Sequence, residues 1–230
     1  IANPGFAAAV TNDTNVVLDA STGYRDVLFC DEMGSSPACD VGVRFIAQVS
    51  RTGAADQVFG QLVSAYEMAS RTPMLVGANL SSPEDDSTSL ANYNLHMAML
   101  DFLHTKYAGT SPLHITLHAG EVTPEFLPPG SNHNTFHIRS AVELGHAERI
   151  GHGLDIMTET NSAGLLATMR DRKVMVEVCL SSNDQILEIS GTAHPLATYL
   201  EAGVPVALAT DDQGVSRSSM AGEYLRAALD

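Results

Sequence analysis

The chain has 230 residues, of which 44% are hydrophobic and 17% charged, a composition typical of a globular protein with a sizeable core. Twelve Lys and Arg against 27 Asp and Glu give a formal net charge of −15, which makes nucleic acid and anionic membrane surfaces poor partners. No apolar run approaches the ~20 residues of a transmembrane helix, and a small neutral substrate is compatible with the charge.

The first 42 residues are expected to form a lead-in of helix and loop. Residues 13–30 have the pattern of a helix broken near Gly23. Cys30 and Cys39 bracket a loop rich in Gly, Ser and Pro, and two interpretations of them stay open. A disulfide would stabilise the fold by about 2–3 kcal/mol and would indicate a periplasmic or secreted protein, whereas free thiols would indicate a cytoplasmic one. Cys179 lies in an apolar run and is expected to be a core thiol.

From residue 43 onward, strand and helix patterns alternate and are joined by short links. The expected strands are 43–49, 74–80, 113–118, 149–152, 174–180 and 204–210. The expected helices are 56–70, 89–107, 138–145, 162–172, 195–203 and a last one from 218 onward. A long loop with several prolines covers 122–136. Such alternation is typical of βαβ units and a parallel sheet.

The predicted fold class is α/β, as an incomplete (β/α)8 barrel of the TIM type. A closed barrel needs eight strands and about six are visible, so two are expected upstream and both ends, Ile1 and Asp230, are expected to be cut. Residues 1–230 are predicted to be a single partial barrel domain, with 1–42 as the lead-in and 43–230 as the barrel. An open doubly wound sheet is the alternative, but no Gly-rich phosphate-binding turn follows an expected strand. The two open sheet edges favour a homo-oligomer.

Three short strings with histidine and acidic side chains stand where expected strands end. They are His118-Ala119-Gly120-Glu121, Ile150-Gly151-His152-Gly153 and Thr210-Asp211-Asp212. The carboxyl ends of barrel strands lie on one shared face, so we expect these side chains to converge. Their types suit a divalent metal, an activated water and a proton donor.

Each string also has a simpler structural interpretation. A single His at a strand end, such as His118, is often structural, and His152 between two glycines is compatible with an exposed turn. Asp211 and Asp212 are compatible with a helix N-cap and its neighbouring acid. His114 lies ~13 Å from His118 along an extended strand, so the two cannot hold one ion.

Together, H-A-G-E at 118–121, R-I-G-H-G at 149–153, E-V-C-L-S-S-N at 177–183 and T-D-D at 210–212 resemble the adenosine deaminase family of the amidohydrolase superfamily. Their order and spacing agree with that family from about Val43 to the end of the chain. The pair of Cys30 and Cys39 also resembles a pair found in secreted bacterial members.

The resemblance implies a role for each matching residue. His118 would be a zinc ligand, and Glu121 the acid that protonates N1 of the purine. His152 would orient and deprotonate the attacking water. Asp211 would be a further zinc ligand that also holds this water, and Asp212 would form a hydrogen bond with the purine N7.

Two departures from the family pattern stand out. The family's first strand carries a His-x-His motif with two more zinc ligands, and no His-x-His occurs in this chain. The family's purine-contacting glycine falls at Ser82, and the following Pro83-Glu84-Asp85 is expected to help shape the pocket. Ser82 and Gly120 are nevertheless predicted, with Asp212, to be the substrate-binding positions.

The resemblance implies an enzyme, a zinc-dependent hydrolase that converts adenosine or 2′-deoxyadenosine to the inosine product and ammonia. A small-molecule purine nucleoside is then the expected partner. One alternative keeps this reaction for another 6-aminopurine nucleoside or a related metabolite. A second alternative is an inactive, metal-poor fragment that serves as a binding or interaction module.

Overall fold

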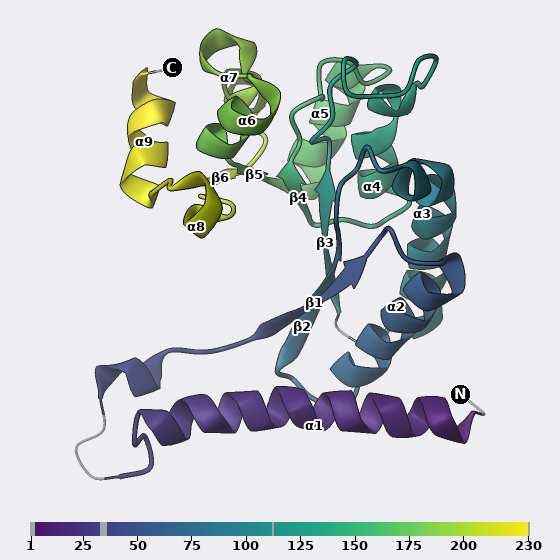
Figure 1. The fold of residues 1–230 in the computed structure, drawn as a ribbon, viewed down its shortest axis with the longest axis vertical. Helices are drawn as coiled ribbons and strands as arrows, with labels where there is room; N and C mark the ends of the chain where they lie inside the picture. The colour runs from purple at the N-terminus through teal and green to yellow at the C-terminus, as the bar shows by residue number, and fades with distance from the viewer. Residues whose placement is uncertain (1–2, 33–35, 112, 230) are drawn as a thin grey trace.

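The computed structural model describes residues 3–32, 36–111 and 113–229, and these contain a sheet of six parallel strands (Figure 1). Each strand pairs with the strands that precede and follow it in the chain. The strands are β1 (Phe45–Ser50), β2 (Leu75–Ser81), β3 (His114–Ala119), β4 (Arg149–His152), β5 (Met175–Val178) and β6 (Val206–Leu208).

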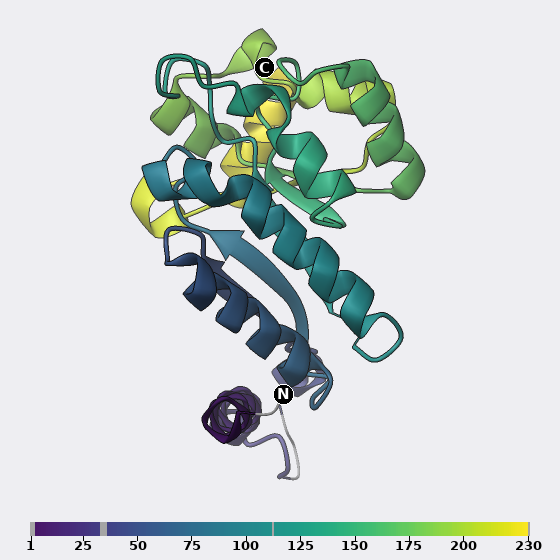
Figure 2. The ribbon, with the colours of Figure 1, turned by 90° about the vertical axis from the view of Figure 1, so that its right-hand side faces the viewer.

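Helices join the strands and cover the sheet. They are α2 (Ala55–Ala69), α3 (Ser87–Tyr107), α4 (His137–Glu143), α5 (Ser162–Arg172), α6 (Leu180–Leu187), α7 (Leu196–Ala202), α8 (Gln213–Ser216) and α9 (Met220–Leu229). Figure 2 shows α2 and α3 side by side across one face of β1 and β2. The core lies at this junction, where Leu62 and Leu100 of the helices and Leu80 and Ile115 of the strands are at most 2% exposed.

The fold is an incomplete (β/α)8 barrel, which confirms the predicted fold class. All five strand pairs are parallel, and the strand order runs from β1 to β6 without reversal. A doubly wound sheet reverses its order at a switch point, so that alternative was wrong. β1 and β6 are the two edges of the described sheet.

The N-terminal helix α1 is longer than the sequence pattern indicated. It runs without a break over Pro4–Val27, below the strands in Figure 1. Asn3 caps it by accepting hydrogen bonds from the N–H groups of Gly5 and Phe6, and a proline suits the first helical turn. The expected break at Gly23 was wrong, because one glycine costs a helix only about 1 kcal/mol.

The two cysteines that follow α1 are joined as a disulfide. Their Cα atoms are 5.5 Å apart. Of the two interpretations left open by the sequence, the structure therefore agrees with the disulfide. Residues 33–35 of the loop that it closes, and the chain ends Ile1 and Asp230, lie outside the described residues. Cys179 is buried, as predicted.

The main local error concerns the segment after β5. The expected strand 174–180 ends at Val178, and α6 begins at Leu180. The other expected strands and helices of the barrel agree with the structure to within two residues. No helix in the described part of the chain is long and apolar enough to cross a bilayer.

Candidate active site

A cavity of about 390 Å3 lies among the strands, and its lining comes from β1 to β6 or the residues just after them. Four of the residues predicted for the site line it: His118, His152, Asp211 and Asp212. A fifth, Glu121, contacts both histidines. The three strings from separate strand ends therefore meet, as predicted.

His118, Glu121 and His152 lie in contact with one another. Nε2 of His118 lies 3.0 Å from one carboxylate oxygen of Glu121, and Nδ1 of His152 lies 3.3 Å from the other. The two imidazole rings are 4.5 Å apart between centroids. The exposed-turn interpretation of His152 was wrong, since its side chain is only 5% exposed.

The pKa values of His118 and His152 are shifted in opposite directions. Burial lowers the pKa of His118, but its hydrogen bonds to Glu121 and Glu84 outweigh burial and raise it to about 9. Burial, followed by the neighbouring His118, lowers the pKa of His152. At neutral pH His152 is therefore an unprotonated imidazole, the form that a general base requires.

Asp211 approaches the site from the end of β6. Its carboxylate accepts a hydrogen bond of 2.7 Å from the hydroxyl of Ser182. Ligand atoms of Asp211, His152 and Cys179 lie within 4.8 Å of one another. Asp212 occupies the N-cap position of α8, as the simpler interpretation predicted, but its side chain makes no cap hydrogen bond.

Glu84 is the main residue of the site that the predicted site residues did not include. Its side chain is fully buried between β2 and α3, and it lies 2.6 Å from Nδ1 of His118 and 3.0 Å from Nε2 of His137. It also accepts hydrogen bonds from the N–H groups of Gly120, at 2.8 Å, and Glu121, at 3.2 Å. Burial alone would raise the pKa of Glu84, but His137 and His118 hold it well below its usual range.

Asn183, which supports His152, was also not among the predicted site residues. The side chain of Asn183 lies 3.1 Å from Nδ1 of His152 and 3.2 Å from Nε2 of His194, and all three are buried. The string E-V-C-L-S-S-N contained this signal, because it places polar residues where an apolar run continues into a buried helix. Pro83-Glu84-Asp85 was expected to help shape the pocket, but nothing in the sequence indicated that Glu84 contacts His118.

Ser82 and Gly120 do not line the cavity. Ser82 has a φ of +82°, a conformation natural to glycine, and its hydroxyl lies 2.8 Å from that of Ser50. Gly120 has a φ of +88° and packs against Ile138 and Asp155. Their predicted contacts with substrate stay predictions.

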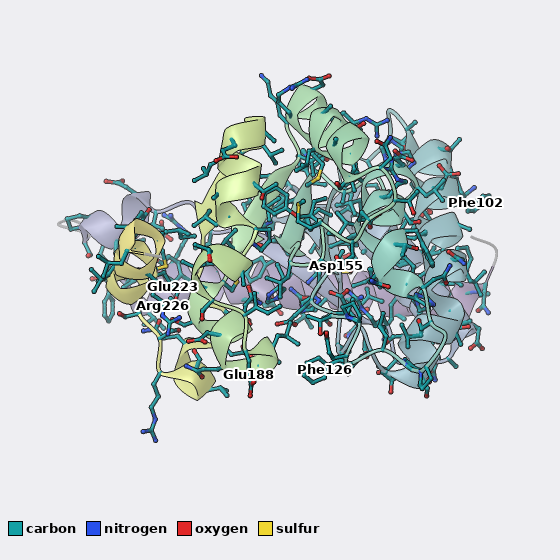
Figure 3. The ribbon with its side chains drawn as sticks, turned by 90° about the horizontal axis from the view of Figure 1, so that it is seen from above. Phe102, Phe126, Asp155, Glu188, Glu223 and Arg226 are labelled. Carbon is teal, nitrogen blue, oxygen red and sulfur yellow. A yellow bond between two sulfur atoms is a disulfide. The ribbon has the colours of Figure 1, made fainter. Side chains whose placement is uncertain are left out.

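A second cavity, of about 650 Å3, lies between the loops that follow β3, β4 and β5. It is lined by Phe126, Asp155 and Glu188, and it shares no lining residue with the first cavity. Seen from above, Asp155 lies towards the middle of the molecule, whereas Phe126 and Glu188 lie towards its edge (Figure 3).

The donor set of the first cavity fits part of a zinc site. Imidazole and carboxylate are ligands that zinc accepts, and ligand atoms of His118, Glu121 and His152 lie within 4.8 Å of one another. The contact between Glu84 and Nδ1 of His118 is also the support that metal-binding histidines typically have. His118 and Asp211, the two predicted ligands, occur in different donor groups of the described residues, and His152 belongs to both groups.

The chain matches a family model described as "Adenosine deaminase" over residues 28–229. Among curated relatives, an adenosine deaminase of Yersinia pseudotuberculosis is 38% identical over 127 residues, which cover 54% of this chain and 34% of that protein. An adenosine deaminase of Escherichia coli strain SE11 is 35% identical over the same lengths. These matches cover about a third of the relatives.

Solved structures give the same assignment of fold. An Arabidopsis protein named ADAL, in complex with IMP, superposes with a TM-score of 0.58 at 26% identity, covering 81% of this chain and 47% of that one. The N6-methyl-AMP deaminase of Arabidopsis thaliana superposes at 0.56 with 27% identity, covering 81% and 48%. A zinc-bound amidohydrolase at 0.55 and 19% identity, covering 82% and 47%, shares the fold.

Proposed function

This chain belongs to the adenosine deaminase family, and from that premise we propose that it is part of a zinc-dependent hydrolase acting on adenosine or 2′-deoxyadenosine. The reaction replaces the 6-amino group by oxygen and releases ammonia. The observation that carries the proposal is the close approach of His118, Glu121 and His152 to one another, beside Asp211 and Asp212.

Each residue has a role that its surroundings support. Glu121 donates the proton that makes the purine ring electrophilic, and its carboxyl group lies in the centre of the site, in contact with His118 and His152. His152, whose pKa is lowered mainly by burial, accepts a proton from the attacking water. Asp211 holds that water on the other side, and Asp212 binds the purine N7.

His118 and Asp211 are the residues of this chain that would hold the zinc ion. When bound, zinc lowers the pKa of a water molecule towards ~7, so that hydroxide is available near neutral pH. Two further ligands would come from the His-x-His motif of the family, which this chain lacks. The chain spans about half the length of the solved structures that it matches.

The exact aminopurine is a separate choice within the same reaction class. The curated relatives at 35–38% identity are named adenosine deaminases, whereas the Arabidopsis structures at 26–27% identity are named for N6-methyl-AMP or hold IMP. The higher identity favours a nucleoside. A 6-aminopurine nucleotide is the second candidate, favoured by the structural matches.

The disulfide of Cys30 and Cys39 supports an oxidising compartment, so we place the protein in the periplasm or outside the cell. Thiol labelling of protein taken directly from its native cells tests this, and two reactive thiols would contradict it. The open edges β1 and β6 support self-association. Light scattering that finds only a monomer would contradict that.

The deaminase proposal is tested on a longer chain that includes the segment upstream of this one, loaded with zinc. Adenosine, 2′-deoxyadenosine, AMP and N6-methyl-AMP are compared by the ultraviolet change that accompanies deamination. Glu121→Gln should lower kcat by about 10²–10⁴-fold, the usual contribution of a general acid. Glu125→Gln, in the exposed loop four residues further on, is the control. Absence of turnover on every aminopurine would overturn the proposal.

A further inference from the structure

Three of the four partners of Glu84 lie in the single turn from His118 to Glu121. The carboxylate contacts Nδ1 of His118, while Nε2 of the same ring contacts Glu121. In the metal-free chain the imidazole is therefore held at both nitrogens, and a zinc ion on His118 would replace Glu121 at Nε2 while the contact with Glu84 stays. The imidazole cannot rotate without losing a charge-assisted hydrogen bond, the stronger kind in proteins.

The two backbone contacts of Glu84 hold the turn itself. The N–H groups of Gly120 and Glu121 are consecutive, and both donate to Glu84. Consecutive N–H groups that surround one anion form a nest, a geometry that fixes the local backbone. The direction in which the Glu121 side chain leaves β3 is thereby set by the carboxylate that also holds His118.

We propose that Glu84 is a positioning residue, which holds the imidazole of His118 and the carboxylate of Glu121 in one geometry for the reaction. The roles of those two residues rest on the proposed function. The position of Glu84 makes the effect indirect, since it does not line the cavity in which substrate would bind. Removing a carboxylate that supports a ligand histidine typically lowers metal affinity or activity about 10–100-fold.

His137 offers a control that distinguishes a positioning role of Glu84 from a purely stabilising one. It is 1% exposed, and its Nε2 atom contacts the second carboxylate oxygen of Glu84 at 3.0 Å. It does not line the cavity either. If Glu84 were only half of a buried ion pair, Glu84→Gln and His137→Gln would have equal effects. A positioning role predicts that only Glu84→Gln disturbs His118 and Glu121.

The first measurement uses the metal-free 230-residue chain. Long-range 1H–15N spectra report whether Nδ1 of His118 carries a hydrogen-bonded proton, and the backbone amide signals of Gly120 and Glu121 report the turn. Glu84→Gln should abolish the first signal and shift the other two, whereas His137→Gln should leave all three in place. If Glu84→Gln does not fold, Glu84→Asp replaces it, because it keeps the charge but is one methylene too short.

The second measurement uses the longer zinc-loaded chain. Glu84→Gln should lower kcat and zinc affinity each by about 10–100-fold, with little change in KM, and His137→Gln should change kcat less than the Glu84 variant does. Equal effects of the two variants in both measurements would overturn the inference. An inactive wild-type chain would refute the deaminase proposal instead, while the spectra would still decide whether Glu84 holds His118 and Glu121.

Discussion

Replacing Gly120 by alanine should destabilise the fold by about 2–5 kcal/mol, through two separable causes. The backbone at Gly120 has a φ of +88°, and this left-handed region costs a residue with a Cβ about 1–2 kcal/mol. The new Cβ would also lie 2.7 Å from Oδ1 of Asp155 and 2.8 Å from Cδ1 of Ile138. Both side chains are at most 5% exposed, so neither can move into solvent, and overpacking of this kind costs about 1–3 kcal/mol.

Gly109→Ala is the matched control, because Gly109 has a similar φ of +78° but nothing within 4 Å of the position of a Cβ. It should show only the backbone cost of about 1–2 kcal/mol. Urea denaturation of both variants gives the free energies of unfolding, and their difference isolates the steric clash. Equal losses in the two variants would refute the packing that we derive around Gly120.

Two further outcomes are expected. The pair of Glu84 and His118 should stabilise the metal-free chain most between pH 4.5 and 6.5, the ordinary pKa values of glutamate and histidine. The raised pKa of His118 contributes stability that is lost as the pH rises from 6.5 through about 9, and the lowered pKa of Glu84 contributes stability that is lost as the pH falls below 4.5. The difference in urea midpoint between the wild type and Glu84→Gln isolates this pair and should be largest in that window, and a difference that does not change with pH would contradict both shifts. At Ser82, with its φ of +82°, glycine should be more stable than alanine by about 1 kcal/mol, the reverse of their usual order in helices and strands. Thermal denaturation of Ser82→Gly and Ser82→Ala checks this order.

The barrel elements could be predicted because their signals are local. Strands buried on both faces appear as short apolar runs, and the helices between them repeat apolar residues at helical spacing. β3, for example, is an apolar run with turn residues before and after it. The end of β5 could not be placed in the same way. The buried α6 contains Ser182 and Asn183, and a buried polar segment has no amphipathic pattern.

The site could be predicted only as far as it lies at strand ends. His118, His152 and Asp211 follow apolar runs, and the rule that barrel strands present their carboxyl ends to one face brings them together. Glu84 and His137 come from a loop and a helix, and no periodicity relates them to β3. Their roles depend on contacts across 34 and 53 positions of sequence, counted as 118 − 84 and 137 − 84. Contacts between residues so far apart in the sequence can be identified only once the fold is known.

The backbone takes a left-handed conformation at four positions where strands end. Ser82, Gly120, His152 and Asp211 all have positive φ angles, at or just after the ends of β2, β3, β4 and β6. For a residue with a Cβ this conformation costs about 1–2 kcal/mol, and three of these four carry one. Such strain persists only where surrounding contacts over-determine the backbone. At β3 that contact is Glu84, and at β6 it is the Ser182 hydroxyl on Asp211. A search for glycines alone would therefore find only one of these four positive-φ positions.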